Sequence, residues 1–264
     1  MPRAKRRLGQ HFLTDPGILA RIADALEAGP DDTVLEIGPG PGGLTEALTR
    51  RAGRIIVVEK DRDLIQPLRA RLPDVKVIEG DALTLDWHSV ATPPFLVTGN
   101  IPYNITSPLL EKALTPPEPD RIVFLVQKEV ADRITARPGT SEYGALSVGV
   151  QAVARAERLF TVAAGAFQPR PKVDSAVLRI VPLDEPLVSR PLRGSFRAVV
   201  VGLFGFRRKQ LLRGLRELTG WESSQLSALL REVELPQTVR PETLSPEQFA
   251  RLHQTLVDWG WARR

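Results

Sequence analysis

The chain has 264 residues, and 42% of them are hydrophobic, which is enough to bury a core in one large domain or in a large and a small one. It has no cysteine and three scattered histidines, so disulfides and thiolate metal sites are excluded and we expect no bound metal. The net charge of +5 and the isoelectric point near 9.9 favour a polyanionic partner.

The sequence gives no sign of a membrane protein. No apolar run approaches the roughly eighteen residues of a membrane span. The basic start, residues 1–7, is not followed by the apolar segment of a signal peptide. We therefore expect a cytoplasmic protein with no membrane contact, and a monomer.

The first two-thirds of the chain alternates strand-like and helix-like segments. Short apolar runs predict strands at Thr33–Ile37, Arg54–Glu59, Val75–Ile78, Phe95–Thr98 and Arg121–Val126. Helical patterns lie between them, as at Leu44–Arg51 and Arg62–Arg71. Strands separated by helices indicate a parallel sheet that is covered on both faces.

Two further strands are predicted at Val153–Phe160 and Ser175–Val181, as an antiparallel hairpin at the edge of a seven-stranded sheet. The Pro-rich stretch Pro182–Pro191 is typical of a linker. Only helical patterns follow, at Phe196–Phe204, Lys209–Leu218, Gln225–Val233 and Pro246–Trp259. The prediction is an α/β, Rossmann-like domain at residues 1–184 and a small all-α domain at residues 185–264.

A glycine-rich loop follows the first predicted strand. Gly38, Gly40 and Gly43 match the pattern G-x-G-x-x-G, which lets a backbone approach a dinucleotide pyrophosphate or the amino-acid part of S-adenosylmethionine. Two prolines in the loop leave fewer N–H groups for a pyrophosphate. Glu59, about twenty residues further on, is placed to accept both hydroxyls of a ribose in either class of enzyme.

Asp81 follows the third predicted strand within Gly80-Asp81-Ala82. An acidic residue there can accept the amino group of a bound adenosyl ligand, which favours S-adenosylmethionine over a nicotinamide cofactor. The alternative is that Asp81 only caps a helix or turn.

The tetrapeptide Asn100-Ile101-Pro102-Tyr103 follows the fourth predicted strand, at the sheet edge where ligands bind. An exocyclic amine is a poor nucleophile because its lone pair is delocalised into the ring. The Asn100 side-chain carbonyl and the Ile101 backbone carbonyl can accept both of its N–H bonds and localise that lone pair. Pro102 fixes the backbone, and Tyr103 offers a ring for stacking. The alternative is an ordinary turn that caps a strand.

Four motifs in this order resemble the rRNA adenine dimethyltransferase family, which includes the KsgA/RsmA small-subunit enzymes and the Erm resistance methylases. They are Gly9–Leu13, Asn100–Asn104, Phe167–Ser175 and Leu203–Lys209. The long N-terminal motif and the helical C-terminal region are more similar to KsgA/RsmA. Two residues depart from the pattern: His11 replaces the usual Asn, and Ile101 replaces the Leu common in KsgA.

The resemblance implies a class I methyltransferase fold and S-adenosylmethionine as the cofactor. It also implies dimethylation of the exocyclic N6 of two adjacent adenosines, in a hairpin loop near the 3′ end of 16S rRNA within an immature 30S subunit. Three alternatives stay open: an Erm-like 23S rRNA target, a non-catalytic assembly or RNA-binding factor on the same scaffold, and a nicotinamide oxidoreductase.

The resemblance assigns residues to these roles. The expected cofactor-binding residues are Gln10, His11, Leu13, Gly38, Gly40, Glu59, Lys60, Asp81, Ala82 and Asn100. The expected catalytic residues, which hold the target base, are Asn100, Ile101, Pro102, Tyr103 and Phe167. Tyr103 and Phe167 are expected to sandwich the extruded adenine. The Pro-rich flank of Phe167 indicates an exposed loop, the alternative being an aromatic residue of the core.

The basic residues outside the pocket are expected to contact RNA phosphates. They are Arg6, Arg7, Arg170, Lys172, Arg207, Arg208 and Lys209. The alternative for each short run of charge is an ordinary solvated surface.

Overall fold

The computed structural model describes residues 4–5 and 8–261. The chain forms two compact units, residues 1–131 with 156–182 and residues 132–155 with 183–264. The division expected at residue 184 lies two residues from the observed one at 182, and it also misses one stretch, residues 132–155. That stretch belongs to the second unit because α6 (Ala145–Gln151) packs against α7 (Arg193–Phe204) and α10 (Pro246–Asp258).

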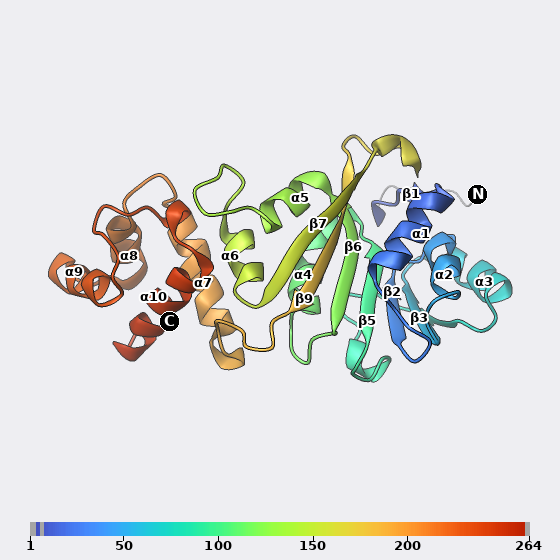
Figure 1. Cartoon of the computed structure of the whole chain (residues 1–264), viewed down its shortest axis with the longest axis horizontal. Helices are drawn as coiled ribbons and strands as arrows, with labels where there is room; N and C mark the ends of the chain where they lie inside the picture. The colour runs from blue at the N-terminus through green and yellow to red at the C-terminus, as the bar shows by residue number, and fades with distance from the viewer. Residues whose placement is uncertain (1–3, 6–7, 262–264) are drawn as a thin grey trace. The chain divides into compact units, whose positions relative to one another are not determined.

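A seven-stranded sheet forms the centre of the first unit, with the strand order β4-β3-β2-β5-β6-β9-β7 (Figure 1). The strands are β2 (Thr33–Ile37), β3 (Arg54–Glu59), β4 (Lys76–Glu79), β5 (Leu96–Asn100), β6 (Arg121–Gln127), β7 (Ala154–Val162) and β9 (Ser175–Pro182). Strands β2 to β6 pair in parallel, and β9 pairs antiparallel with β6. The predicted sheet, mostly parallel with an antiparallel edge, is therefore confirmed.

The order in which successive strands are added to the sheet reverses between β2 and β5, although the two strands themselves are parallel. From β2 the chain proceeds outward to β3 and β4, and it then returns to pair β5 with the other side of β2. In open α/β sheets, ligands bind outside the carboxyl ends of the strands at such a switch point. Here Ile37 and Asn100 end the two strands at this place.

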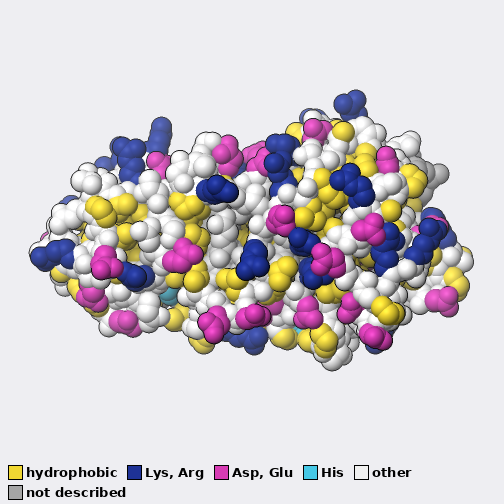
Figure 2. Space-filling model, in the orientation of Figure 1, with side chains coloured by type: hydrophobic (Ala, Val, Ile, Leu, Met, Phe, Trp, Pro, Cys, Tyr) yellow, Lys and Arg dark blue, Asp and Glu magenta, His cyan; other side chains and the backbone are white. Residues whose placement is uncertain are grey.

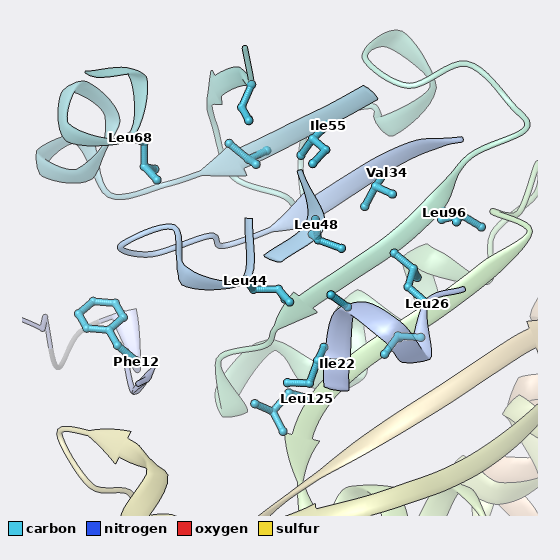
Figure 3. Packing of buried hydrophobic residues seen from close by; sticks show 14 of the residues in the cluster. Phe12, Ile22, Leu26, Val34, Leu44, Leu48, Ile55, Leu68, Leu96 and Leu125 are labelled. Atoms are coloured by element: carbon cyan, nitrogen blue, oxygen red, sulfur yellow. The ribbon is translucent and has the colours of Figure 1, made fainter. Parts of the chain in front are cut away.

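Five helices accompany the sheet: α1 (Pro16–Ala25), α2 (Gly43–Leu48), α3 (Arg62–Arg71), α4 (Thr106–Ala113) and α5 (Lys128–Ile134). The helical patterns predicted α2 and α3. Helix α1 begins at an Asp15 N-cap, whose side chain accepts a hydrogen bond from the Ile18 N–H at 3.0 Å. Figure 3 shows Ile22 and Leu26 of α1 directed toward the strands that carry Val34, Leu96 and Leu125.

A second, two-stranded sheet joins segments that are far apart in the sequence. Strand β1 (Phe12–Leu13) pairs antiparallel with β8 (Phe167–Gln168). Phe12 packs into the core cluster of the first unit, and so does Phe167. The N-terminal motif and the third motif of the sequence are thereby brought side by side.

The second unit is helical, with α8 (Leu211–Thr219) and α9 (Ser223–Glu232) in addition to α6, α7 and α10. Its interior includes a stacked pair of rings, Phe204 and Phe249, at 5.7 Å between centroids. The segment expected to be a linker is bound to its own unit, because the Leu183 N–H donates to the Val153 carbonyl at 3.0 Å. Within the described part of the chain, no helix has the length and apolar character needed to cross a membrane.

Candidate functional site

A cavity of about 140 Å³ lies at the carboxyl ends of β2, β3, β4 and β5, entirely within the first unit. It brings together almost every residue that the sequence assigned to the cofactor and the target base. These are Gln10, His11, Gly38, Gly40, Glu59, Lys60, Asp81, Ala82, Asn100, Ile101, Pro102 and Tyr103. Leu13 lines a second cavity, which shares Gly38, Gly40 and Asn100 with the first.

The glycine-rich loop needs its glycine at position 40. Gly40 has a φ of 56°, and a Cβ there would lie 3.0 Å from the ring of Phe12. The Gly40 N–H donates to Glu59 Oε2 at 3.1 Å. The loop is therefore held against both the N-terminal segment and the end of β3.

Glu59 is a buried carboxylate at the end of β3, with an exposed fraction of 5%. Its second oxygen, Oε1, accepts a hydrogen bond from the Asp61 N–H at 2.7 Å. Burial raises the pKa of Glu59, and the backbone N–H groups of Asp61 and Gly40 act against that rise. Each carboxylate oxygen accepts one backbone donor and has a lone pair left for a ribose hydroxyl.

Asp81 follows β4 and pairs with Lys60, whose Nζ lies 2.7 Å from Asp81 Oδ2. The Lys60 ammonium, followed by the Leu83 N–H, lowers the pKa of Asp81. The Leu83 N–H donates to Asp81 Oδ1 at 3.0 Å, which is the turn-capping contact expected if Asp81 were only a cap. Asp81 thus caps a turn and also presents an ionised carboxylate to the cavity.

Asn100 is oriented by the N-terminal segment. Its Nδ2 donates to the His11 backbone carbonyl at 2.7 Å. Because a carbonyl can only accept, this contact identifies the amide nitrogen and leaves Oδ1 as an acceptor. The Ile101 N–H donates to the Leu125 carbonyl at 3.0 Å, which fixes the peptide that follows β5. No donor from the described residues is bonded to the Ile101 carbonyl.

Tyr103 is held at both ends. Its hydroxyl lies 2.8 Å from Ser175 Oγ, and burial raises its pKa. Its ring stacks on His11 at 5.7 Å between centroids, with 24° between the ring planes. His11 Nδ1 lies 2.7 Å from the Pro169 carbonyl, so the nitrogen that faces this acceptor carries the proton. His11, at the position where the family pattern has Asn, therefore contacts Tyr103 and the segment after β8.

Phe167 does not lie in an exposed loop, and this expectation is wrong. The ring is 5% exposed and belongs to the hydrophobic core of the first unit. The reason is the pairing of β8 with β1, in which Phe167 stands opposite Leu13. Phe167 lines neither of the two cavities, and the ring that stacks on Tyr103 is that of His11.

The basic residues predicted to contact RNA differ in their surroundings. Arg170 and Lys172 are exposed in the first unit, and Arg208 and Lys209 are exposed in the second. Arg207 is engaged within its own unit, because its Nε lies 2.9 Å from Glu242 Oε2 and its guanidinium also donates to the Thr140 carbonyl. Arg6 and Arg7 lie outside the described residues. Figure 2 shows basic and acidic side chains interspersed over the face that it presents.

Three residues of the site were missed by sequence reasoning: Lys5, Asp61 and Gly99. Asp61 carried a detectable signal, since an Asp directly before the helical pattern at Arg62 is a typical N-cap. Lys5 carried none, because it reaches Asp61 across 56 positions of the sequence. Among the described residues, no group of three or more His, Cys, Asp or Glu side chains has an arrangement that would hold a metal ion.

The fold and the cavity together define a Rossmann-like methyltransferase. A mostly parallel seven-stranded sheet with an antiparallel β9 carries a glycine-rich loop after β2 and the buried carboxylate of Glu59 at the end of β3. The chain belongs to the ribosomal RNA adenine dimethylase family, whose model matches residues 1–258. It is accordingly an rRNA adenine dimethyltransferase that uses S-adenosylmethionine, and the nicotinamide alternative is dropped.

Relatives support this assignment over nearly the full length of both chains. The ribosomal RNA small subunit methyltransferase A of Acidithiobacillus ferrooxidans is 41% identical over 265 residues, covering 98% of this chain and 97% of the relative. The protein of the same name from Nitratidesulfovibrio vulgaris is 44% identical, covering 97% of each chain.

Two solved structures are similar in fold and in length. A dimethyladenosine transferase from Plasmodium falciparum has a TM-score of 0.83 and 26% identity, covering 95% of this chain and 98% of that one. The 23S rRNA methyltransferase ErmE has a TM-score of 0.72 and 30% identity, covering 93% and 99%.

Proposed function

We propose that this protein dimethylates the exocyclic N6 of two adjacent adenosines in a hairpin loop near the 3′ end of 16S rRNA. The substrate is an immature 30S subunit in the cytoplasm, and the enzyme acts as a monomer without a metal ion. The observation that carries this proposal is the identity of 41–44% to enzymes named for the small subunit, over 97–98% of this chain. The similarity to ErmE makes 23S rRNA the second candidate.

Asn100 and Ile101 carry the proposed catalysis. S-adenosylmethionine, when bound, supplies an electrophilic sulfonium methyl group. Asn100 Oδ1 and the Ile101 carbonyl accept the two N–H bonds of the target amine and direct its lone pair along the line of transfer. The orientation of the Asn100 amide by the His11 carbonyl supports this role. Such preorganised acceptors lower the barrier because they need no rearrangement in the transition state.

No strong base is required before the attack. The amine proton becomes acidic only when the nitrogen has gained its positive charge, and the two carbonyl acceptors hold that proton until water removes it. The Tyr103 ring offers one of its faces to the flat base, and His11 stacks on the opposite face of the Tyr103 ring. Since the base must leave any helical stack, an unpaired loop is the preferred substrate.

The remaining assignments follow the cavity. Glu59 and Lys60 lie at the ribose, Asp81 with the Ala82 backbone at the adenine, and Gly38 and Gly40 at the methionine part of the cofactor. Gln10 and His11 close the cavity, and Leu13 supports them from the adjoining side. The support is that these residues line two adjoining cavities, and that Gly38 and Gly40 line both of them.

We further propose that the helical domain at residues 185–264 contacts the RNA or the ribosomal particle. Exposed Arg208 and Lys209 supply phosphate contacts from this domain, and Arg170 and Lys172 supply them beside the site.

The test is to incubate the protein with labelled S-adenosylmethionine and separated ribosomal subunits from a strain that lacks the enzyme. The labelled nucleotides are then mapped. We expect label on two adjacent adenosines of 16S rRNA in the 30S fraction and none in the 50S fraction. Label confined to 23S rRNA would instead establish the Erm-like alternative. Cofactor binding without transfer to either subunit would support a non-catalytic assembly factor.

A further inference from the structure

The buried carboxylate of Asp61 joins the N-terminal segment to the cofactor cavity. We call Lys5 and residues 8–12 the N-terminal strap. Lys5 Nζ lies 2.5 Å from Asp61 Oδ1, and Gln10 Nε2 donates to Asp61 Oδ2 at 3.0 Å. A hydrogen bond within the strap links its two parts, because the Lys5 N–H donates to Gln10 Oε1 at 2.7 Å. The side chain of Asp61 is only 2% exposed and that of Lys5 is 27% exposed, so the carboxylate is buried while the ammonium group partly reaches solvent.

From Asp61 the contacts continue into the cavity. The Asp61 N–H donates to Glu59 Oε1, and the Gly40 N–H donates to Glu59 Oε2. Gly40 in turn lies against the ring of Phe12, the last residue of the strap. The result is a closed circuit of contacts, in which the strap is fixed to the cavity at Asp61 and again at Gly40.

We propose that Asp61 is a positioning residue of the methyl-transfer reaction: it latches the N-terminal strap over the cavity and thereby sets the rate at which cofactor enters and product leaves. This inference rests on the proposed role of Glu59 and the strap in cofactor binding. Lys5 is the strap's ionic contact to the latch, and Gln10 is the strap residue that both touches Asp61 and lines the cavity.

The charge of Asp61 is suited to this role. Burial acts to raise its pKa, but the bonds from Lys5, Gln10 and the Asp63 N–H, together with the charge of Lys5, hold the pKa below the usual range. The ionised carboxylate accepts from both strap residues at once, which a neutral amide cannot do without presenting its own NH₂ to one of them. A hydrogen bond to a charged group is also stronger than one between neutral groups.

Asp61 has a second task that a test must preserve. It caps helix α3, because its Oδ1 accepts a hydrogen bond from the Asp63 N–H at 3.2 Å. Asn is as good an N-cap as Asp, so Asp61→Asn keeps the cap and the backbone bond to Glu59 while it removes the charge. Asp63→Asn is the matched control. Asp63 also contacts Lys5, at 2.6 Å, but its side chain is 76% exposed, and Gln10 donates to Asp61 and not to Asp63.

The experiment measures the dissociation rate of S-adenosylhomocysteine by stopped-flow displacement from the full-length protein. We expect Asp61→Asn to raise this rate about tenfold, since it weakens two bonds to a buried charged group. Asp63→Asn should change it less than about twofold, because exposed ion pairs contribute little. Lys5→Met tests the same latch from the strap side and should accelerate release severalfold.

A second readout separates latching from a general loss of structure. Hydrogen exchange of the backbone N–H groups in residues 8–12 should become faster in Asp61→Asn, while exchange in β2 and β3 stays as in the parent protein. An unchanged dissociation rate, or an equal effect of Asp63→Asn, would overturn the inference. Absence of S-adenosylhomocysteine binding in the parent protein would instead contradict the proposed cofactor site.

Discussion

At the scale of single residues, the orientation of one amide group decides which atoms are available for catalysis. The His11 carbonyl occupies the NH₂ side of Asn100, so its Oδ1 stays available as an acceptor. A target amine needs an acceptor at that position and would be repelled by an NH₂ group. If Asn100 has its proposed role, the N-terminal strap assists catalysis by orienting this amide, without touching the amine.

Asn100→Ala should lower kcat for methyl transfer by a factor on the order of 10² to 10³, because it removes an acceptor that acts mainly in the transition state. The affinity for S-adenosylhomocysteine should change little. Single-turnover transfer rates and calorimetric titration measure the two quantities. A loss of cofactor affinity as large as the loss of rate would show that Asn100 acts in cofactor binding instead.

Glu36 is a second residue with unusual electrostatics. It lies in β2 with an exposed fraction of 1%, and its Oε2 has no hydrogen-bond partner among the described residues. Burial is the main cause that raises the pKa of Glu36 to about 8. The carboxyl group is therefore protonated in the folded protein at pH 7, whereas it is ionised in the unfolded chain.

The raised pKa makes stability fall as pH rises, since the unfolded chain releases this proton at lower pH than the folded protein. The contribution of Glu36 is fully present below its unfolded pKa of 4.5 and is lost as pH rises to about 8. Between pH 6 and pH 8, Glu36 should lower the unfolding free energy of the parent protein by about 2 kcal/mol. The Glu36→Gln variant stays neutral and should not show this loss. Urea denaturation of both proteins at both pH values measures this, and parallel pH profiles would contradict it.

At the scale of elements, the pairing of β1 with β8 explains why Phe167 is a core residue. The pairing holds the strap's last residue, Phe12, beside the segment that provides the Pro169 carbonyl for His11. The strand pair is short, two residues on each side, so its side chains must supply much of its stability. Phe12 and Phe167 are both buried there.

Phe167→Ala should lower the free energy of unfolding by about 3–5 kcal/mol, the usual cost of removing a buried phenyl ring. Phe167→Leu should cost less than about 1.5 kcal/mol and should retain turnover. Chemical denaturation and methyl-transfer assays on the two variants are the measurements. If the Leu variant were fully stable but inactive, the ring would have to act on the target base.

Gly99 allows β2 and β5 to approach closely at the switch point of the sheet. A Cβ at position 99 would lie 2.4 Å from the Ile37 carbonyl oxygen, so only glycine fits next to β2. Gly99 directly precedes Asn100. The distance between the glycine-rich loop and the tetrapeptide Asn100–Tyr103 therefore depends on a residue that has no side chain.

At the scale of the whole molecule, the net charge of +5 is consistent with an RNA substrate, and exposed basic side chains are more available to phosphates than those already bonded within the protein. Replacing Arg208 and Lys209 together by Ala should weaken RNA binding and flatten its salt dependence, by up to about 0.7–0.9 in slope per lost phosphate contact. RNA affinity measured over a series of salt concentrations gives the slope.

Arg207→Ala provides the matched control in the same run of charges. Because Arg207 is bonded to Glu242 and Thr140, its loss should leave the salt slope unchanged and lower the melting temperature of the protein. If Arg207→Ala flattened the salt slope and the Arg208 and Lys209 double variant did not, Arg207 and not the other two residues would be the phosphate contact.

Much of the fold could be predicted from local pattern. The strands β2 and β3 have the bounds that their apolar runs predicted, and the helices α3 and α10 differ from expectation by no more than one residue at an end. Helices α1, α4, α5 and α6 were not predicted. Helix α4 is eight residues long with a proline at its third position, so it is too short to show a clear helical period.

The sequence by itself determined which candidate groups meet at the site, because Glu59, Asp81 and Asn100 each lie at or just after the end of a strand whose apolar run is recognisable. Strand ends in a parallel sheet converge at one edge, so local pattern was sufficient to gather these groups. The tertiary structure alone decided that Phe167 is buried, that Arg207 is paired and that Asp61 holds Lys5. Each of these depends on contacts between distant positions, and such contacts are set by the packing of whole elements, which local periodicity does not encode.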